Sequence, residues 1–346
     1  WDGSGGWTYG GYWGGNVGYP YNLQDCGRKY LAGNGGCVYI DLDHLELAIP
    51  EVLSAWDHVA ATHAMLRIAR SALEQANQKM PDGLSIQVLV NNTDGLSNSY
   101  GSHFNCLITR ETWNNLFHHK LHQLLFLASY QVSSIVFTGQ GKVGSENGRP
   151  ETFYQLSQRA DFIETLMGPQ TTHTRPIVNS RDEALCGSRS HGVSYDSAAD
   201  DLARLHCIFF DNSLCHVASL LKVGVTQIIL AMIESGFTKL DLLLDDPVNA
   251  AVHWSHGADL QSRSRLVSGE EVTAVELQLR FLEEARACAE RGELSTVPRY
   301  AEILDLWEDT LRKLQAGDLP SLVGRLDWVL KLHIIERSLE QRDDLD

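Results

Sequence analysis

The sequence predicts an α+β protein, with strands concentrated in its first part and helices in its last part. Segments with strand character lie between residues 37 and 210, whereas long helical periodicity dominates residues 214–341. Hydrophobic residues make up 43% of the 346 residues and charged residues 21%, which is normal for a chain that buries a substantial core. Because strands and helices are largely segregated rather than alternating, the pattern favours an α+β fold over a parallel βαβ fold.

The individual elements follow from local patterns. Residues 1–36 are rich in Gly, Trp and Tyr and cannot build a core, so we expect a flexible arm followed by one large domain at residues 37–346. Apolar or β-prone runs between turn residues predict strands at residues 37–41, 85–91, 100–108, 132–138, 153–166 and 205–210. Apolar residues at helical spacing predict helices at residues 53–80, 111–127, 214–235, 273–291, 300–316 and 319–341. A polar stretch at residues 187–201 predicts an exposed loop.

The net charge of −16, from 28 basic and 44 acidic residues, restricts the expected partners. So acidic a chain is poorly suited to a nucleic-acid backbone or to an anionic membrane surface, and we expect neither as a partner. The most apolar segment, residues 218–233, is short for a membrane span and contains Lys222 and Gln227. We interpret it as a core helix.

Cysteine usage indicates the cellular compartment. The seven cysteines are odd in number and irregularly spaced, and they form no CxxC motif. This pattern argues against a disulfide framework or a structural zinc site and favours a reducing environment. Residues 1–25 show neither the basic start nor the apolar stretch of a signal peptide. A cytoplasmic location is therefore expected.

An acidic cluster with a histidine follows the first predicted strand. Tyr39, Asp41 and Asp43 would share one face of that strand, and His44 and Glu46 come shortly after. Several carboxylates that converge with a histidine are typical of a site for a hard cation such as Mg²⁺, because this ion prefers oxygen ligands. The alternative is a solvated strand end that carries ordinary surface acids.

A second polar cluster comprises residues 91–94 and 99–105. Buried amides and hydroxyls between two strands can position a polar ligand. The string NNTDG is also strong turn chemistry by itself. The spacing of these residues favours the turn.

Three arginines, Arg159, Arg175 and Arg181, recur in a region with apolar strand character. Arginine is suited to bidentate capture of phosphate or carboxylate oxygens. An arginine cluster together with an acidic cluster suggests a site for a nucleotide and Mg²⁺. The alternative is structural ion pairing, for example with Asp161 and Asp182.

Three further signals favour structural roles. A lone histidine on an apolar strand, as at His206, is more often a core residue than a ligand. His118 and His122 are four residues apart on a predicted helix and would suit a metal, but their polar neighbours are more typical of a surface face. The Gly-rich loop at residues 139–144 lacks the Gly-Lys-Ser/Thr ending of a Walker motif.

Taken together, these segments resemble the Pup ligase/depupylase family. The matching strings cover the chain from about residue 37 to its end and are, in order, VYIDLDHLELAIPE, NNTDGLSNSYGSHFNCLITR, FTGQGKVG, FYQLSQRADFIETLMGPQTTHTRPIVNSRDE, RLHCIFFDNSL, LLKVG with LAMIE, SH at residues 255–256, and LDWVLKLHIIE. The family has a glutamine-synthetase-like fold, so the resemblance implies a curved, mostly antiparallel sheet cradle packed with helices.

The resemblance also implies catalytic and metal-binding roles. Asp41 matches the catalytic Asp of the family. Tyr39 and Glu46 match ligands of one Mg²⁺. His103 and His206 match ligands of the other, so His206 is expected to be a ligand although spacing alone favours a core role.

For the nucleotide, the resemblance implies ATP, or ADP plus phosphate, bound with Mg²⁺. Arg159 and Arg181 match the arginines that contact its phosphates, and Arg175 is a further candidate from the same arginine cluster. Two positions depart from the family pattern, since Phe104 stands where the family has Glu and Leu45 where it has Pro. The family's N-terminal metal-binding strand and its small C-terminal domain are absent from the 346 residues. We therefore expect residues 37–346 to correspond to the family's large catalytic domain.

Within the family, the SQRADF string, the TT and RPIVN run after it and the LAMIE segment are more similar to the depupylase branch. The resemblance therefore implies a hydrolase that depends on ATP and Mg²⁺ and cleaves the amide bond between a Pup-like modifier and a substrate lysine. The implied partners are Pup or a Pup-like modifier and the modified proteins of a bacterial proteasome pathway. Two alternatives are a carboxylate–amine ligase of the Pup-ligase type and a non-catalytic homologue that binds the modifier.

Overall fold

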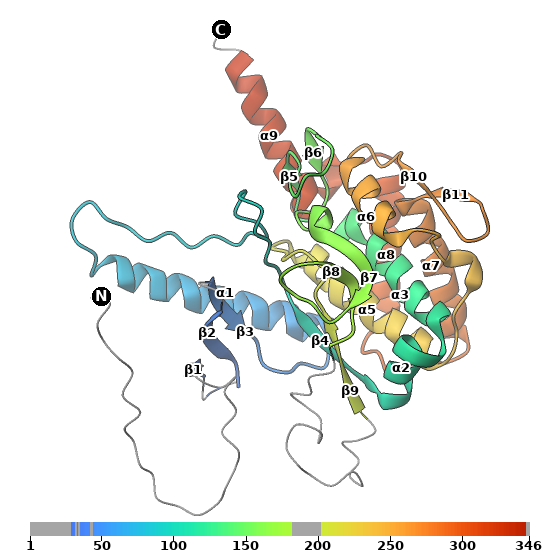
Figure 1. The fold of residues 1–346 in the computed structure, drawn as a ribbon. Helices are drawn as coiled ribbons and strands as arrows, with labels where there is room; N and C mark the ends of the chain where they lie inside the picture. Colours follow the sequence, from blue (N-terminus) through green and yellow to red (C-terminus); the bar gives the residue numbers. More distant parts are fainter. Residues whose placement is uncertain (1–28, 32, 34, 42–43, 182–201, 344–346) are drawn as a thin grey trace, which may run out of the picture. The chain divides into compact units, whose positions relative to one another are not determined.

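The computed structural model describes residues 29–31, 33, 35–41, 44–181 and 202–343 (Figure 1). The chain divides into two compact units, residues 1–48 and residues 49–346. Residues 1–28 of the expected arm and the loop expected at residues 187–201 lie outside the described residues.

The first unit contains a three-stranded antiparallel sheet in the order β1-β2-β3. Its strands are β1 (Lys29–Tyr30), β2 (Cys37–Asp41) and β3 (His44–Ala48). The strand predicted at residues 37–41 is confirmed. The sequence patterns do not predict β3, although polar and apolar residues alternate along it as they do along a half-buried strand.

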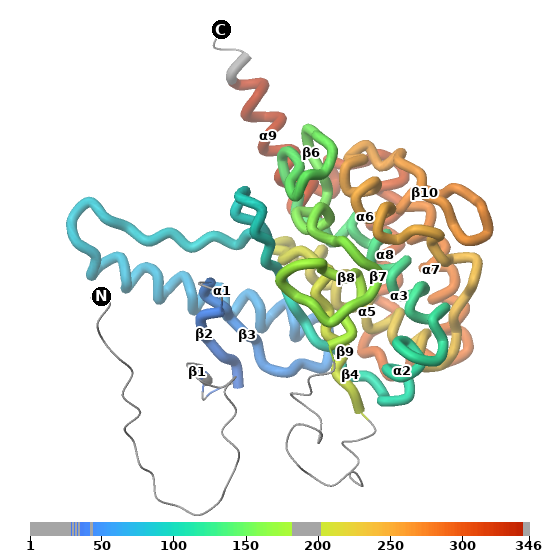
Figure 2. The backbone as a smooth tube through the Cα atoms, viewed as in Figure 1, coloured from blue at the N-terminus to red at the C-terminus, as the bar shows by residue number. Residues whose placement is uncertain are grey.

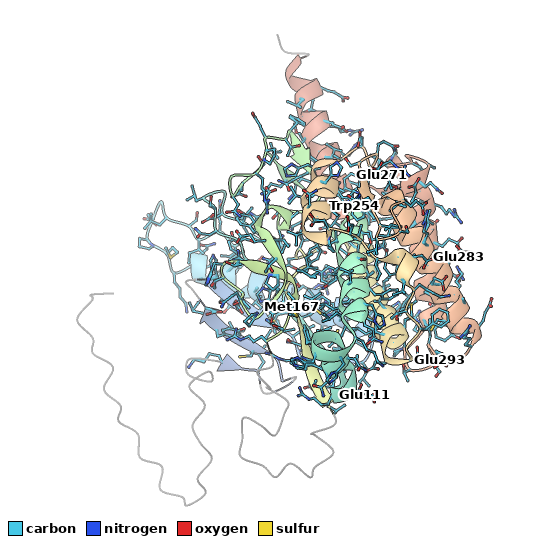
Figure 3. All side chains as sticks on the ribbon, turned by 45° about the vertical axis from the view of Figure 1, so that its right-hand side comes forward. Glu111, Met167, Trp254, Glu271, Glu283 and Glu293 are labelled. Carbon is cyan, nitrogen blue, oxygen red and sulfur yellow. The ribbon has the colours of Figure 1, made fainter. Side chains whose placement is uncertain are left out.

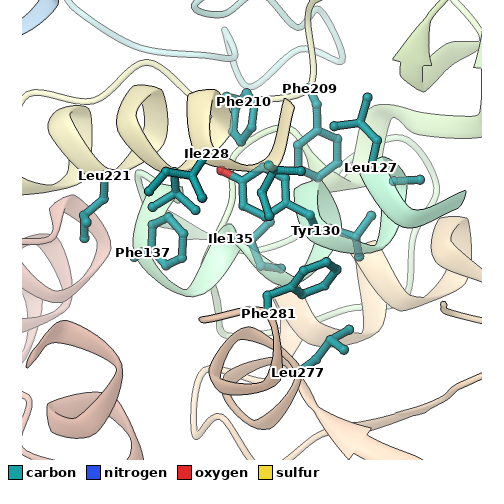
Figure 4. Close-up of a cluster of buried hydrophobic side chains, with 14 of the residues drawn as sticks. Leu127, Tyr130, Ile135, Phe137, Phe209, Phe210, Leu221, Ile228, Leu277 and Phe281 are labelled. Atoms are coloured by element: carbon teal, nitrogen blue, oxygen red, sulfur yellow. The ribbon is translucent and has the colours of Figure 1, made fainter. Parts of the chain in front are cut away.

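Helices build most of the core of the second unit. The four that pack together are α3 (Leu121–Ser133), α5 (His216–Glu234), α7 (Ala274–Glu290) and α8 (Tyr300–Gln315). Figure 4 shows Tyr130 and Phe281 among the buried side chains between them, and the Tyr130 hydroxyl lies 3.0 Å from Thr226 Oγ1. Burying one large apolar side chain contributes roughly 1.5–3 kcal/mol. This core supports the polar region described below.

Helix α5 confirms the prediction of a core helix. Among the described residues it is the one helix long and apolar enough to cross a membrane by length and composition, but 78% of its most apolar window is buried inside the protein. Its buried Lys222 donates a hydrogen bond of 3.0 Å to the backbone oxygen of Asp211. Because its apolar surface is already covered by protein, α5 is weak evidence for membrane association.

The other helices begin at recognisable capping residues. Helix α1 (Ala55–Asn77) confirms the helix predicted at residues 53–80, and Ser54 Oγ accepts a hydrogen bond from the Asp57 amide at its start. The sequence patterns do not predict α6 (Pro247–His256). Its start carries both a capping aspartate, Asp246, and a proline at the first position, which are N-terminal helix signals.

The last two predicted helices are also present. Helix α8 fits the prediction at its N-terminal end, whereas α9 (Asp327–Asp343) begins several residues later than expected, after a 3₁₀ turn at Pro320–Leu322. Exposed acidic side chains occur on several kinds of element, since Glu271 lies on a strand, Glu283 on α7 and Glu293 in the turn after α7. In Figure 3, Glu271, Glu283 and Glu293 point away from the body of the unit, and all three are exposed.

Strand pairing in the second unit is mostly antiparallel. The antiparallel pairs are β4 (Phe104–Thr109) with β9 (Leu202–Cys207), β5 (Lys142–Val143) with β6 (Tyr154–Gln155), and β10 (Arg263–Arg265) with β11 (Glu271–Thr273). The parallel pair is β7 (Ile163–Gly168) with β8 (Arg175–Asn179). Only residues 169–174 connect these two strands, which is unusually short for a parallel connection.

Two strand predictions are wrong. Residues 132–138 are helical, because they form the end of α3 and then α4 (Ile135–Thr138). Their β-branched residues favour a strand locally, but complete burial among other helices favours the conformation that satisfies its own backbone. Residues 85–91 belong to no described strand (Figure 2). The Asn77 side chain satisfies the backbone there, since it accepts from the Ile86 amide and donates to the Ile86 oxygen.

Two longer predicted elements are interrupted. The helix predicted at residues 111–127 is split into α2 (Arg110–Asn114), a π-helical turn at Asn115–His119, and α3. The strand predicted at residues 153–166 is split into β6, a 3₁₀ turn at Ala160–Phe162, and β7. The second interruption places Arg159 and Asp161 in the buried polar region rather than on a regular strand.

Candidate functional site

The β2–β3 hairpin gathers the predicted acidic cluster on one face. Its register pairs Tyr39 with Glu46 and Asp41 with His44. Because side chains alternate along a strand, these four residues share one face of the hairpin. Asp41 and His44 are exposed, whereas Tyr39 and Glu46 are half-buried. The structure therefore places four of the five residues of the predicted cluster on one face.

The donor atoms on this face fit a hard cation. Asp41 and Glu46 supply carboxylate oxygens, the type of ligand that Mg²⁺ prefers, and Tyr39 adds a neutral phenol oxygen on the same face. Asp43 lies outside the described residues. The family resemblance gives no role to His44, whose place directly opposite Asp41 follows from the hairpin register.

In the second unit, the β4–β9 ribbon brings His103 and His206 together. His103 immediately precedes β4, and His206 lies on β9 opposite Asn105. The two imidazole rings are edge to face, with their centroids 5.4 Å apart. The residues are 103 positions apart in the chain, so their pairing depends on the antiparallel register.

Positive charge surrounds the His103 ring. Desolvation by the surrounding protein, together with the nearby charges of Arg159, His206 and Arg175, lowers the pKa of the imidazole well below its ordinary value. The neutral form, which is the form that binds metals, is therefore favoured. Imidazole nitrogen suits borderline ions such as Zn²⁺ better than Mg²⁺, so this pair by itself does not define a magnesium site. Within the described part of the chain, no three His, Cys, Asp or Glu side chains form a metal-binding group.

Arg159 is one of the most deeply buried side chains, with 1% of its surface exposed. Its guanidinium donates to Ser99 Oγ at 3.2 Å and to the Ile208 oxygen at 2.8 Å, and both acceptors are neutral. Its Nε has no hydrogen-bond acceptor. Burial, with a contribution from the charge of Arg175, lowers the pKa of Arg159 to about 10, and the Asp211 carboxylate opposes this effect only in part, so the guanidinium still carries its charge at neutral pH.

Arg175 and Arg181 lie on and just after β8. The buried Arg175 donates to the Thr171 oxygen at 2.9 Å and to the Ser99 oxygen at 2.5 Å, so both Arg159 and Arg175 hold Ser99. Arg181 is half-buried, and its backbone amide donates to Asn179 Oδ1.

The surroundings of Arg159 and Arg175 fit an anionic ligand. No carboxylate of the described residues forms a salt bridge with either guanidinium. Two buried positive charges held only by neutral acceptors are unfavourable unless a negative charge compensates them. The orphaned Nε of Arg159 adds a donor without an acceptor. A phosphate group would supply both the charge and the acceptors.

The alternative of an ion pair between these arginines and Asp161 is wrong. Four donors converge on this fully buried carboxylate, and they are Lys142 Nζ at 3.2 Å, Gln155 Nε2 at 2.8 Å, His256 Nε2 at 2.8 Å and the Glu146 amide at 2.8 Å. Burial by itself raises the pKa of Asp161, but the hydrogen bonds from His256, Gln155 and Glu146 outweigh it and lower the pKa to about 2. We call Lys142, Glu146, Gln155, Asp161 and His256 the Asp161 network. His256 lies 95 residues from Asp161 in the chain, and the other members have no regular spacing, so no periodic pattern indicates the network.

The NNTDG segment forms the predicted turn and also contributes a buried amide side chain, that of Asn92. Asp94 Oδ1 accepts from the amides of Leu96 and Asn98, which confirms the turn. Asn92, by contrast, is fully buried, and its backbone amide donates to Gln158 Oε1 at 2.8 Å. Its Oδ1 accepts from the Asn212 amide at 2.7 Å. The buried amide thus fixes the segment that leads toward His103.

The remaining signals are structural, as spacing predicts. In the Gly-rich loop, the Gly141 oxygen accepts hydrogen bonds from the Gln158 and Lys331 side chains, so this oxygen already has partners within the protein. A Cβ at Gly141 would collide with the Tyr154 hydroxyl, which explains the glycine. His118 and His122 are exposed, and the π-helical turn between them interrupts the helical spacing that would pair them on a metal.

Comparisons with known proteins assign the chain to a family. A family model described as Pup-ligase protein matches residues 17–346. The chain is 39% identical over 326 residues to a depupylase of Acidothermus cellulolyticus, with 93% of this chain and 60% of that protein covered. It is 34% identical over 316 residues to a Pup–protein ligase of Kribbella flavida, with 90% and 65% covered.

A solved structure has the same fold. The Pup ligase PafA in complex with ADP matches with a TM-score of 0.73 and 25% identity, covering 92% of this chain and 67% of that one. The chain therefore belongs to the Pup-ligase family, and its α+β, glutamine-synthetase-like fold is confirmed. It spans about three-fifths of the length of the curated depupylase that it matches.

Proposed function

We propose that this chain is the large catalytic part of an isopeptidase that depends on ATP and Mg²⁺ and cleaves the amide bond between a Pup-like modifier and a substrate lysine. The observation that carries the proposal is the shared hairpin face, on which Asp41 lies beside Tyr39 and Glu46 and opposite His44. The 39% identity with a depupylase supports hydrolysis, although similar ligases are only a few per cent less identical.

Asp41 has the central role in the proposed reaction. A carboxylate is ionised at neutral pH, so its position rather than its protonation sets its reactivity. Asp41 attacks the amide carbonyl or orients a water molecule that does so, and the carbon–nitrogen bond then breaks as the lysine amine leaves with a proton derived from water. In the first route, water then hydrolyses the bond between the acyl group and Asp41, which releases the modifier carboxylate and restores the aspartate. Tyr39 and Glu46 hold a divalent cation on the same face of the hairpin.

The arginines have a binding role in the same proposal. Arg159, Arg175 and Arg181 hold the phosphates of the nucleotide, and the first two support this assignment because they are buried and form no salt bridge with a carboxylate of the described residues. His103 and His206 hold a second divalent ion. A bound metal ion, together with the arginines, would supply the positive charge that stabilises the negative charge developing in the transition state.

Two alternative functions use the same residues. A ligase would phosphorylate the modifier carboxylate and join it to a lysine amine, and ADP would then form in step with conjugate. A hydrolase releases modifier without stoichiometric use of ATP. A non-catalytic homologue would bind the modifier and do neither.

The partners follow from this proposal. The modifier and the modified proteins are the macromolecular substrates, and the structure of PafA in complex with Pup shows that another member of the family binds such a modifier. We also propose a cytoplasmic location, where modified proteins, ATP and Mg²⁺ are available.

The test is incubation of the full-length protein with Mg-ATP and a Pup-conjugated substrate, followed on a gel. We expect release of free modifier, and we expect Asp41→Asn to abolish it while nucleotide affinity, measured by calorimetry, stays largely unchanged. Asp57→Asn, at an exposed acid that follows the α1 N-cap, is the matched control and should remain active. Full activity of Asp41→Asn would remove Asp41 from the mechanism.

A further inference from the structure

The buried Asp211 carboxylate contacts the turn that carries Arg159. Asp211 is 2% exposed, and both of its carboxylate oxygens accept hydrogen bonds. Oδ1 accepts from the Ser157 hydroxyl at 3.0 Å, and Oδ2 accepts from the backbone amides of Gln140 at 2.8 Å and Gln158 at 2.9 Å. The carboxylate therefore holds the two residues that directly precede Arg159.

The Ser157 hydroxyl connects Asp211 to the backbone of Arg159. A carboxylate at neutral pH only accepts hydrogen bonds, so the single hydroxyl hydrogen of Ser157 points to Asp211. The hydroxyl oxygen accepts in turn from the backbone amides of Arg159 at 3.1 Å and Ala160 at 3.2 Å. Without the carboxylate the hydroxyl could rotate and donate elsewhere, so Asp211 determines how Ser157 holds the turn.

The segment that carries Asp211 also holds the other end of Arg159. Arg159 Nη2 donates to the Ile208 backbone oxygen at 2.8 Å, and Ile208 lies just before Asp211 in the chain. The buried Lys222 of α5 donates to the Asp211 backbone oxygen at 3.0 Å and so anchors this segment on the core. Residues 208–211 thus hold the backbone of Arg159 through Ser157 and its guanidinium directly.

We propose that Asp211 is a positioning residue, which acts through the Ser157 hydroxyl to hold the turn at residues 157–160 so that Arg159 presents its guanidinium to a phosphate. This inference rests on the proposed function in one respect, namely that Arg159 binds a phosphate of the nucleotide. The sequence patterns identify Arg159 as a candidate but assign no role to Asp211 or Ser157, which are 54 residues apart in the chain.

The first test reads the guanidinium without nucleotide. In protein labelled with ¹⁵N in arginine, the Nε–H signal of Arg159 is assigned by its absence in Arg159→Met. Because this guanidinium is buried and held by hydrogen bonds, the signal should show the heteronuclear NOE of a rigid group. Ser157→Ala and Asp211→Asn should each shift the signal and lower its NOE.

The second test measures the affinity for ADP with Mg²⁺ by calorimetry. Ser157→Ala removes the acceptor of the Arg159 and Ala160 amides and should weaken ADP binding roughly tenfold, a typical coupling within one hydrogen-bonded network. In Ser157→Ala combined with Arg159→Met, the loss should equal that of Arg159→Met alone, because the turn then has no guanidinium to position.

Ser129→Ala is the matched control. Ser129 is also fully buried, and its hydroxyl accepts from the Leu244 amide at 2.9 Å, so this variant also removes the acceptor of a backbone amide. It should lower stability without changing the Arg159 signal or the ADP affinity. Thermal unfolding identifies any variant that does not fold, and Ser157→Ala, which keeps the carboxylate, decides the outcome if Asp211→Asn is one of these.

The possible outcomes separate this inference from the proposed function. If Arg159→Met weakens ADP binding while Ser157→Ala leaves the ADP affinity unchanged, Asp211 has no positioning role through Ser157 and the phosphate assignment stands. If Arg159→Met binds ADP as tightly as wild type, the phosphate assignment and this inference both fail. A shifted signal and weaker binding in Ser157→Ala, with no further loss in the double variant, support both.

Discussion

Two buried cations in the second unit, Lys142 and Arg159, have opposite environments. Lys142 Nζ lies 2.8 Å from a Glu146 carboxylate oxygen and 3.2 Å from one of Asp161, so its charge is compensated inside the protein. Arg159 is more deeply buried, yet the acceptors of its guanidinium are a hydroxyl and a backbone carbonyl. A compensated charge can stabilise the fold, whereas an uncompensated one is retained at a cost in stability and is available to a ligand.

The contrast also separates two roles of a buried basic residue, structural and ligand-binding, that the sequence alone does not distinguish. Lys142 and Arg159 both stand in polar strings, and either would suit a phosphate by composition. The structure engages Lys142 in the Asp161 network and leaves Arg159 without a carboxylate partner among the described residues. We therefore expect substitutions in the Asp161 network to reduce stability, and substitutions at Arg159 to reduce ligand binding more than stability.

The largest expected effect is at Asp161. Asp161→Asn replaces a carboxylate that accepts from four donors with an amide whose NH₂ group faces donors, and it leaves Lys142 with one carboxylate. The free energy of unfolding should fall by about 3–5 kcal/mol, the usual cost of breaking a buried charged network. Urea denaturation followed by circular dichroism measures this change.

The control for this experiment is an exposed ion pair. Asp245 pairs with Arg265 at the surface, where such pairs contribute about 0–1 kcal/mol. Asp245→Asn should therefore change the free energy of unfolding by no more than about 1 kcal/mol. Equal losses in the two variants would contradict the structural role of the Asp161 network.

The second expected effect is on ligand-linked stability. ADP with Mg²⁺ at 100 times its dissociation constant should stabilise the wild type by about 2.7 kcal/mol. In Arg159→Met more than half of this gain should disappear, because the phosphate loses its guanidinium, while the ligand-free protein changes by only about 1–2 kcal/mol. Thermal unfolding with and without ADP measures both quantities.

Arg149→Met is the matched control for Arg159→Met. Arg149 is also partly buried and donates to backbone carbonyls, those of Asp161 and Ile163, but it has no assigned part in binding. The Arg149→Met variant should therefore keep the full stabilisation by ADP. A full ADP effect in Arg159→Met would mean that its buried charge does not serve the nucleotide.

The third effect is a dependence of stability on pH. The folded-state pKa of Asp161 is lowered to about 2 from an ordinary value of 3.8, so the carboxylate contributes stability that is fully present above about pH 4 and is lost as the pH falls toward 2. The expected contribution is about 2 kcal/mol. Unfolding free energies of wild type and Asp161→Asn, measured from pH 5 to pH 2.5, should converge as the pH falls. A constant difference across this range would contradict the lowered pKa.

The regularly patterned parts of the fold could be predicted from the sequence. The helical periodicity of residues 300–316 predicts α8 almost to the residue, because an amphipathic helix on a core is specified by its own spacing. The strands predicted at residues 132–138 and 85–91 are absent, because at these positions the local pattern does not determine the conformation. There the surroundings, full burial among helices in one case and the Asn77 side chain in the other, decided the conformation.

The candidate site could be predicted only where its residues are close in sequence or match a family motif. Strand alternation places Tyr39 and Asp41 on one face without further information. The pairing of His103 with His206 needs the β4–β9 register, and His256 reaches Asp161 across 95 residues of chain. Contacts of this kind leave no periodic signal, so the Asp161 network appears only in the folded molecule.

The smallest expected effect concerns the space around Arg159. A Cβ on Gly101 would lie 2.6 Å from Arg159 Nη1 and 2.8 Å from its Cζ. The guanidinium is the end of a flexible side chain, but its burial and its bonds to Ser99 and Ile208 restrict where it can move. Gly101→Ala should therefore destabilise by about 1–2 kcal/mol, as overpacking of a buried site does, and weaken ADP binding by displacing the guanidinium.

Gly83→Ala and a double variant separate these two effects of Gly101→Ala. A Cβ at Gly83 meets nothing within 4 Å, although its positive φ adds backbone strain, so Gly83→Ala should lower stability without weakening ADP binding. In Gly101→Ala combined with Arg159→Met, the clash has no guanidinium to displace, and the loss of ADP affinity should equal that of Arg159→Met alone. Additive losses would show instead that Gly101 acts on the nucleotide by a route that does not pass through Arg159.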